Sequence, residues 1–329
     1  MKIRTLAPWL LFAAAAASWA QTPARIVMGG RAVVMVADAV YAFPSARSLV
    51  VAVGGTDQGL GTFLEAVAPG FLAKPPLDRQ AGAEAYAALK PDLVILKSGM
   101  RGALGAGFEA LGIKALYLDL ESPEDYYEDL AVLGAALGQE ARAGELVAYY
   151  RDIVERVAAT RGPDRKRVLV VQATGDGYEV PPDSWMQTRL VEMAGGIPVW
   201  KGSNPGSGWA KVGPEQMAAW NPDIVVVISY REGVSAVAAR VKADPRLSGL
   251  EAVADGAVYG FPQDFYSWDQ PDTRWGLGLL WLGRILGPAG AERPTMESEA
   301  RRFFALFYGF DAAAFDRVIL PRLAGDWQR

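Results

Sequence analysis

Short apolar runs alternate with segments of helical periodicity along most of the chain. Residues 49–53 and 93–97 are rich in apolar and β-branched side chains, and segments with apolar residues at helical spacing follow them. Such runs are typical of strands that are buried on both faces of a parallel sheet. The alternation predicts an α/β fold in which helices cover both faces of each sheet.

One pattern occurs twice, once in each half of the chain. Residues 84–95 and 215–226 both begin with a glutamate, pass through an alanine-containing segment and a Pro-Asp pair, and end in an apolar run. Each copy predicts a short helix, a corner and a strand, because proline disfavours helical geometry in the residue before it. A matched unit in each half predicts two similar lobes.

A long helical pattern separates the two halves. Apolar residues recur at helical spacing from residue 139 to residue 160, and Gly162-Pro163 ends the pattern. The segment is not enriched in Gly, Ser and Pro, as a flexible linker is. We therefore expect a first lobe over residues 21–138, a rigid connecting helix over 139–162 and a second lobe over 163–329.

The first strands are expected next to glycine-rich turns. Residues 25–28 and 32–35 both read as short strands on either side of the turn Gly29-Gly30-Arg31. A glycine-rich loop at 54–59 follows the strand 49–53. This loop lacks the Gly-Lys-Ser/Thr ending of a phosphate-binding P-loop, so a tight turn is the simpler interpretation.

The N-terminus has the pattern of a secretory signal peptide. Lys2 and Arg4 precede an apolar run over residues 6–17, and Ser18-Trp19-Ala20 places small residues at the −3 and −1 positions of a cleavage site. We expect a signal peptide over residues 1–20 with cleavage near Gln21. An N-terminal membrane helix is the alternative, but the apolar run is short for spanning a bilayer.

Composition and charge exclude several classes of protein. Hydrophobic residues make up 51% of the 329 positions and charged residues 21%, which is typical of a globular chain. The formal net charge of −4 disfavours nucleic acid as a partner. We therefore expect no nucleic-acid partner, and we expect the chain to be a monomer.

The chain contains neither cysteine nor histidine. Their absence excludes disulfides, thiol nucleophiles, Ser-His-Asp catalysis and the usual zinc sites. It also excludes a lipid-modified cysteine after the signal peptide. We therefore expect no catalytic residue, no metal site and no cofactor, and we infer a soluble protein of the periplasm of a bacterium with two membranes.

Several features together resemble a known family. They are the two Glu/Pro-Asp units, the long helix between them, Gly195-Gly196 after a helix, and Trp268-Asp269-Gln270-Pro271 leading into Arg274-Trp275 and a further helix. From about Arg25 the chain resembles the class III (cluster A) periplasmic substrate-binding proteins of ABC importers, the siderophore, heme and cobalamin type. The resemblance implies two Rossmann-like α/β lobes with central parallel sheets, one long connecting helix and a ligand cleft between the lobes.

The resemblance also implies a role for the repeated glutamates. Members of this family dock on arginines of the membrane permease through one glutamate on each lobe. By this match, Glu84 and Glu215 are the docking residues, since two carboxylates on separate lobes fix the orientation on a two-fold permease. The alternative is that both are ordinary carboxylates on the solvent-facing side of a helix.

Ligands of open α/β sheets bind beyond the carboxyl ends of the strands. Aromatic side chains there contact flat or apolar ligand surfaces, and arginines pair with carboxylates or oxyanions. Trp268, Tyr230 and Arg231 stand out because they lie in loops, where burial in a core is less expected. For the rest, core packing and a solvated surface are the alternatives. The expected ligand contacts are Tyr41, Lys97, Tyr178, Trp185, Arg189, Tyr230, Arg231, Tyr266 and Trp268, with Asp38, Asp57 and Gln58 in similar positions.

The sequence therefore predicts a binding protein that captures a metal chelate, with a ferric siderophore as the first expectation, and delivers it to an ABC importer in the inner membrane. Cobalamin and a molybdate or tungstate oxyanion are alternative ligands. Heme or a bare metal ion would often recruit His or Cys, although tyrosine also ligates iron. A secreted enzyme on a similar two-lobed fold, or a structural or chaperone-like protein, are alternatives of other classes.

Overall fold

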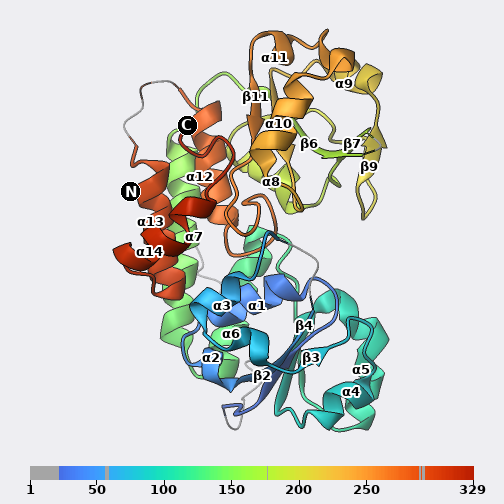
Figure 1. Ribbon diagram of the computed structural model, residues 1–329, viewed down its shortest axis with the longest axis vertical. Coiled ribbons are helices and arrows are strands. Elements are labelled where there is room, and N and C mark those ends of the chain that lie inside the picture. Colours follow the sequence, from blue (N-terminus) through green and yellow to red (C-terminus); the bar gives the residue numbers. More distant parts are fainter. Residues whose placement is uncertain (1–21, 56–58, 176, 289, 291–292) are drawn as a thin grey trace, which may run out of the picture.

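The computed structural model describes residues 22–55, 59–175, 177–288, 290 and 293–329. Two lobes lie one above the other, and helix α7 (Glu140–Ala159) runs along the side of both (Figure 1). The expected signal peptide and the candidates Asp57 and Gln58 lie outside the described residues. In the part of the chain that is described, no helix combines the length and the apolar character needed to cross a membrane.

The first lobe is built on a five-stranded parallel sheet with the strand order β3-β2-β1-β4-β5. Every residue of β1 and β4 is buried, as the apolar runs predict for central strands of a parallel sheet. The strands are β1 (Ile26–Met28), β2 (Val50–Gly54), β3 (Pro76–Leu77), β4 (Leu93–Lys97) and β5 (Ala115–Leu118).

Helices and short 3-10 turns connect these strands. They are α1 (Val33–Tyr41), α2 (Ala46–Leu49), α3 (Phe63–Val67), η1 (Phe71–Ala73), α4 (Ala83–Ala88), η2 (Ser98–Met100), α5 (Arg101–Ala110) and α6 (Pro123–Leu137). The strand expected at residues 32–35 is wrong, because α1 begins at Val33. Gly30 and Ala32 have φ angles of 76° and 52° and turn the chain directly from β1 into this helix. All of α1 is buried, so its sequence shows no polar face that would reveal a helical period.

The second lobe has a six-stranded sheet with the order β11-β10-β6-β7-β9, and β8 pairs with β6. Strands β6, β8, β10 and β11 are parallel, whereas β7 runs antiparallel to both β6 and β9. The strands are β6 (Arg167–Thr174), β7 (Gly177–Val180), β8 (Ile197–Pro198), β9 (Ala210–Val212), β10 (Ile224–Ile228) and β11 (Val258–Gly260). The expected α/β fold of two lobes is thus confirmed, with one antiparallel hairpin added.

The remaining helices belong to the second half of the chain. They are α8 (Met186–Met193), α9 (Pro214–Trp220), α10 (Val234–Lys242), η3 (Pro245–Leu247), α11 (Glu251–Ala254), α12 (Trp275–Leu286), α13 (Met296–Tyr308), α14 (Ala312–Val318) and η4 (Leu320–Arg322).

The repeated unit folds in the same way in both lobes, as α4–β4 and as α9–β10. Asp92 accepts a hydrogen bond from the backbone N–H of Ala24, and Asp223 accepts one from the backbone N–H of Arg167. Arg25 donates to the carbonyl oxygens of Leu89 and Lys90, just after the end of α4. Arg167 donates to those of Trp220 and Asn221, at the end of α9. The corner therefore fastens each helix to the central strand of its lobe, and the repeat extends to two arginines that the sequence pattern did not reveal.

The chain returns to the first lobe near its end. Phe304 of α13 lies 5.8 Å from Phe63 of α3, measured between ring centroids. Arg142 of α7 donates to the carbonyl oxygens of Leu306 and Phe307 at the end of α13. Residues 296–322, which the sequence division assigns to the second lobe, therefore also bind the first lobe and the connecting helix. The residue boundaries of the lobes remain a prediction.

Candidate functional site

A buried segment separates the two sheets. Residues 261–274, here called the junction segment, follow β11 and lead into α12. On one side Tyr266 lines a cavity with Val53 and Gly54 at the carboxyl end of β2. On the other side Asp269 binds Tyr230, just beyond the carboxyl end of β10. The carboxyl ends of strands from both lobes therefore face this segment, which is where open α/β sheets bind ligands.

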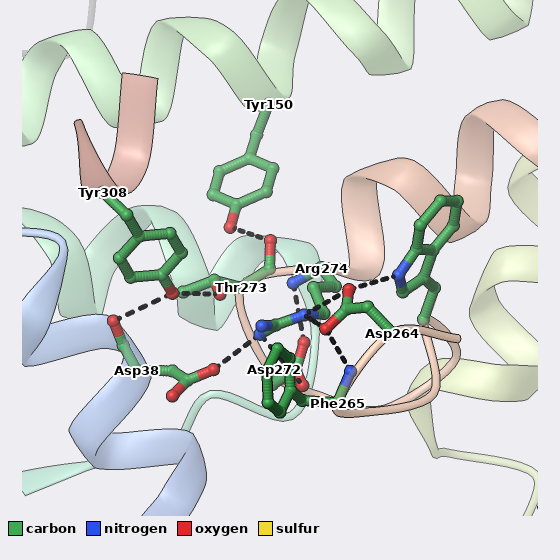
Figure 2. A network of polar contacts seen from close by, with 9 residues as sticks. Asp38, Tyr150, Asp264, Phe265, Asp272, Thr273, Arg274 and Tyr308 are labelled. Atoms are coloured by element: carbon green, nitrogen blue, oxygen red, sulfur yellow. Dashed lines mark hydrogen bonds and ion pairs between the residues drawn. The ribbon is translucent and has the colours of Figure 1, made fainter. Parts of the chain in front are cut away.

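Arg274 is the centre of the junction segment, and its side chain is 0% exposed. Its Nη1 lies 2.6 Å from Asp38 Oδ2, on α1 of the first lobe (Figure 2). Its Nε lies 2.9 Å from both carboxylate oxygens of Asp264. The carboxylate of Asp272 is 3.9 Å from Nη1. One guanidinium group thus joins the two lobes through an ion-pair network without contact with bulk water.

Aromatic rings and hydroxyl groups surround this network. The guanidinium carbon of Arg274 lies 4.4 Å from the ring centre of Phe63 and 4.8 Å from that of Tyr266, within the range of cation–π attraction. The hydroxyl groups of Thr273 and Tyr308 are 2.7 Å apart, and Tyr150 donates to the Thr273 carbonyl oxygen at 2.7 Å (Figure 2). The network therefore also fastens α7 and α13 to the junction.

Three buried carboxyl groups face a single cation in this network. Burial raises the pKa of Asp38 to about 6, although Arg274 opposes the shift. Burial likewise raises the pKa of Asp272 well above its ordinary value. Burial lowers the pKa of Arg274, but the three aspartates more than offset this, so the group stays charged. One cation is thus shared among three acidic groups, and among the described residues one oxygen of Asp38 and one of Asp272 have no hydrogen-bond partner.

Two expected ligand contacts lie in the interior. Tyr41 and Trp268 are both 0% exposed, and the indole N–H of Trp268 donates to Asp264 at 2.8 Å. The expectation that a loop tryptophan is exposed is wrong for Trp268, because both lobes and α12 cover the junction segment. Tyr266 is also buried, but its ring lines a cavity of about 240 Å³. The other walls of this cavity belong to the first lobe and include Val33 and Phe71.

Three partly exposed aromatic side chains of the second lobe lie next to one another. The ring centroids of Trp185 and Trp209 are 5.7 Å apart, and those of Trp209 and Tyr230 are 6.1 Å apart. We call these three residues the aromatic wall. Sequence reasoning missed Trp209, which lies in the glycine- and serine-rich loop before β9. A large apolar side chain in such a loop is the signal that could have identified it.

Lys97 lies at the end of β4 and is already paired. Its ammonium group is 2.7 Å from Glu121 and also donates to the backbone carbonyl oxygen of Asp119. The hydroxyl of Ser98 donates to the Asp119 carboxylate. The position is as expected, beyond the carboxyl end of a parallel strand, but the positive charge of Lys97 is compensated.

The other three expected contacts do not lie in the aromatic wall. Tyr178 donates to Asp244 at 2.6 Å, and burial followed by this carboxylate raises the pKa of Tyr178 to about 12. Arg189 is exposed on α8 and lies 4.0 Å from Glu192. Arg231 is exposed in the loop after β10, next to Tyr230. Their roles as ligand contacts remain predictions.

Glu84 and Glu215 occupy equivalent positions in the two lobes. Each is exposed and is the second residue of its helix, where a negative charge is favourable. Each carboxylate folds back towards the glycine that caps the helix, Gly82 or Gly213. A Cβ atom at these glycines would lie 3.1 Å and 2.9 Å from the carboxylate oxygens, so both sites accommodate glycine for the same reason.

The described part of the chain offers no group of three or more Asp and Glu side chains that is placed to hold a metal ion. The three aspartates of the junction segment and α1 surround the Arg274 guanidinium instead, so that a cationic side chain occupies the space between them.

Comparison with known proteins gives matches over much of the chain. A family model described as periplasmic binding protein matches residues 54–265. A cobalamin-binding protein of Halobacterium salinarum is 29% identical over 187 residues, which cover 56% of this chain and 49% of that protein. The chain therefore spans about half the length of the curated relatives it matches.

Solved structures extend the likeness to nearly the whole chain. A periplasmic solute binding protein of Veillonella parvula superposes with a TM-score of 0.74 at 21% identity, over 90% of this chain and 92% of that one. A molybdate-bound periplasmic binding protein of Haemophilus influenzae superposes with a TM-score of 0.68 at 18% identity, over 88% and 93%. At these identities the likeness establishes the two-lobed fold alone.

Replacing Arg274 by methionine is expected to destabilise the protein strongly. The change leaves buried carboxyl groups without their cation, so the free energy of unfolding should fall by roughly 3–5 kcal/mol. Asp38→Asn removes one of three acidic groups and keeps the shape, and should lower it by at most about 1–2 kcal/mol. Denaturant unfolding at pH 7 measures both, with the exposed Arg302→Met as the control. Equal losses for the two junction variants would contradict the charge balance described above.

The junction also predicts a pH dependence of stability. The folded-state pKa of Asp38, about 6, lies above its ordinary value of 3.8. The contribution of the neutral Asp38 carboxyl to the free energy of unfolding is therefore fully present below about pH 4. It is lost as the pH rises through 6. Between pH 4 and pH 7, the free energy of unfolding of Asp38→Asn should fall less than that of the parent, by up to about 3 kcal/mol. If the free energies of unfolding of Asp38→Asn and of the parent changed in parallel over this pH range, this role of Asp38 would be contradicted.

Proposed function

Because the chain belongs to the periplasmic binding protein family, we propose that it captures a metal chelate outside the inner membrane and delivers it to an ABC-type importer. The family match over residues 54–265 supports a binding function over the alternative of a secreted enzyme. The expected signal peptide supports export to the periplasm as a soluble protein.

A corrinoid, the cobalamin class of chelate, fits the aromatic wall best. Trp185, Trp209 and Tyr230 offer ring surfaces without a net charge, and such surfaces suit the flat and largely apolar face of a corrin ring. The curated relatives of this chain are named cobalamin-binding proteins, which supports the same class. The aromatic wall is the structural observation that carries this choice of ligand.

The other ligands call for positive charge. A ferric siderophore, our first expectation from the sequence, is commonly anionic, and an oxyanion such as molybdate always is. Lys97 is paired with Glu121, and Arg274 is surrounded by aspartates, so neither offers a free cation. Arg189 and Arg231 are exposed and are the residues through which such an anion would bind.

Delivery would use the two matched glutamates. Glu84 and Glu215 are exposed, carry the same local geometry and belong to different lobes. Two carboxylates in this arrangement suit two arginines on a permease with two-fold symmetry. We therefore propose that they dock the protein on the importer.

A ligand panel tests the binding function. Cyanocobalamin in excess over its Kd should raise the melting temperature by about 2 °C or more, whereas ferric siderophores, molybdate and tungstate should not. Trp209→Ala should weaken cyanocobalamin binding about tenfold or more, a loss of about 1.4 kcal/mol. Trp220→Ala, outside the wall but in the same lobe, is the control. A rise in melting temperature with a siderophore or an oxyanion, and none with cyanocobalamin, would contradict the corrinoid proposal. Turnover of a compound would contradict the binding function.

Charge reversal tests the docking role. The double variant Glu84→Lys, Glu215→Lys should abolish import and leave ligand affinity unchanged, because the two carboxylates lie outside the wall. The matched control is Glu109→Lys with Glu251→Lys, which also reverses one exposed glutamate on each lobe. Import is followed with the labelled chelate in cells that depend on it. Normal import by the Glu84, Glu215 variant would refute the assignment.

A further inference from the structure

Two side chains behind the aromatic wall engage the hydroxyl group of Tyr230. It donates to Asp269 Oδ2 at 2.6 Å, and Gln187 Nε2 donates to it at 3.2 Å. A tyrosine hydroxyl has a single proton to donate. That proton is used by Asp269, so the hydroxyl group has none to offer a ligand.

Asp269 is itself fixed from several directions. It is fully buried, accepts a hydrogen bond from Gln187 Nε2 at 2.9 Å, and accepts another from the hydroxyl of Ser267. Gln187 is also buried. Because Asp269 belongs to the junction segment, the position of Tyr230 is tied to the layer between the lobes, and the ring is held in place before any ligand arrives.

The same contacts keep the phenol protonated. Burial, and after it the charge of Asp269, raise the pKa of Tyr230 well above its ordinary value. A side chain must lose its proton to ligate a metal ion strongly. Tyr230 is therefore poorly suited to bind ferric iron through its oxygen, although tyrosine does so in other proteins.

The geometry points to Tyr230 as a residue that contacts the ligand through its ring, with Asp269 and Gln187 as the positioning residues that hold the ring. The inference rests on the proposed function and deepens it. The site selects a chelate by its organic surface, and Tyr230 makes no bond to the metal. A chelate whose metal is saturated by its own groups and is covered by a planar organic ring meets this requirement.

The arrangement of the three rings supports this role. The planes of Trp185 and Trp209 meet at 83°, and those of Trp209 and Tyr230 at 58°. The wall is therefore angular, and Tyr230 forms its end next to the junction segment. A ring that is already fixed loses little conformational entropy on binding, whereas an unrestrained one would lower the affinity.

Affinity for cyanocobalamin in the full chain tests the positioning role. Tyr230→Ala should weaken binding about tenfold or more. Tyr230→Phe, which keeps the ring but loses both hydroxyl contacts, should weaken it less, and by about as much as Asp269→Ala does. Asp269→Ala should weaken binding in the parent but much less in the Tyr230→Ala background, because its effect passes through the ring. Asp269→Asn, whose side-chain oxygen still accepts a hydrogen bond from the Tyr230 hydroxyl, should keep most of the affinity that Asp269→Ala loses. Equal losses in both backgrounds would show a general structural role and overturn the proposal.

A second measurement does not depend on the corrinoid. Ferric nitrilotriacetate, a labile source of ferric ion, is added to the parent protein and to Tyr230→Phe, and the visible absorption band of iron bound to tyrosinate is recorded. No band should appear in either protein. A band that appears in the parent and is lost in Tyr230→Phe would overturn the inference.

The two measurements separate the possible failures. If cyanocobalamin does not bind the parent, the corrinoid proposal fails, and the iron measurement still decides whether Tyr230 ligates metal. If cyanocobalamin binds and Tyr230→Phe loses as much affinity as Tyr230→Ala, the corrinoid proposal stands and the ring-contact inference fails.

Discussion

The buried ion-pair network around Arg274 is the constraint on which the rest of the molecule depends. Through Asp38, at 2.6 Å, it joins the second lobe to α1 of the first lobe, and both side chains are fully buried. Breaking it would leave charges in the interior, which is far more unfavourable than the loss of a surface pair. The distance between the lobes is therefore set by a buried charge as well as by the connecting helix.

The junction segment transmits this constraint to the aromatic wall of the second lobe. Arg274 fixes one end of the segment against the first lobe, and Asp269, five residues earlier, holds the ring of Tyr230. The segment has little regular secondary structure, yet it is almost entirely buried and its polar groups bind one another. Rigidity at this site therefore comes from burial and charge, and not from helices or strands.

Sequence patterns predicted the architecture well and the site less well. The duplicated Pro-Asp unit, the long helix and the parallel strands could be read because each depends on local periodicity. Residues 32–35 could not, since a wholly buried helix shows no polar face. Trp268 was expected to be exposed because it lies in a loop, but burial of that loop results from contacts with both lobes. Trp209 could have been identified as a large apolar side chain in a polar loop, but its neighbours and the partners of Tyr230 depend on contacts between residues tens of positions apart, which no local pattern reveals.

The return of α13 to the first lobe has a consequence for docking on the importer. α7, the Arg274 pair and α13 all bridge the lobes, so we expect an empty and a loaded molecule to differ little in shape. On the proposed docking geometry, Glu84 and Glu215 then present the same spacing in both forms. The importer would then bind unloaded protein as readily as loaded protein. An excess of unloaded protein would therefore compete with loaded protein for the docking site on the importer.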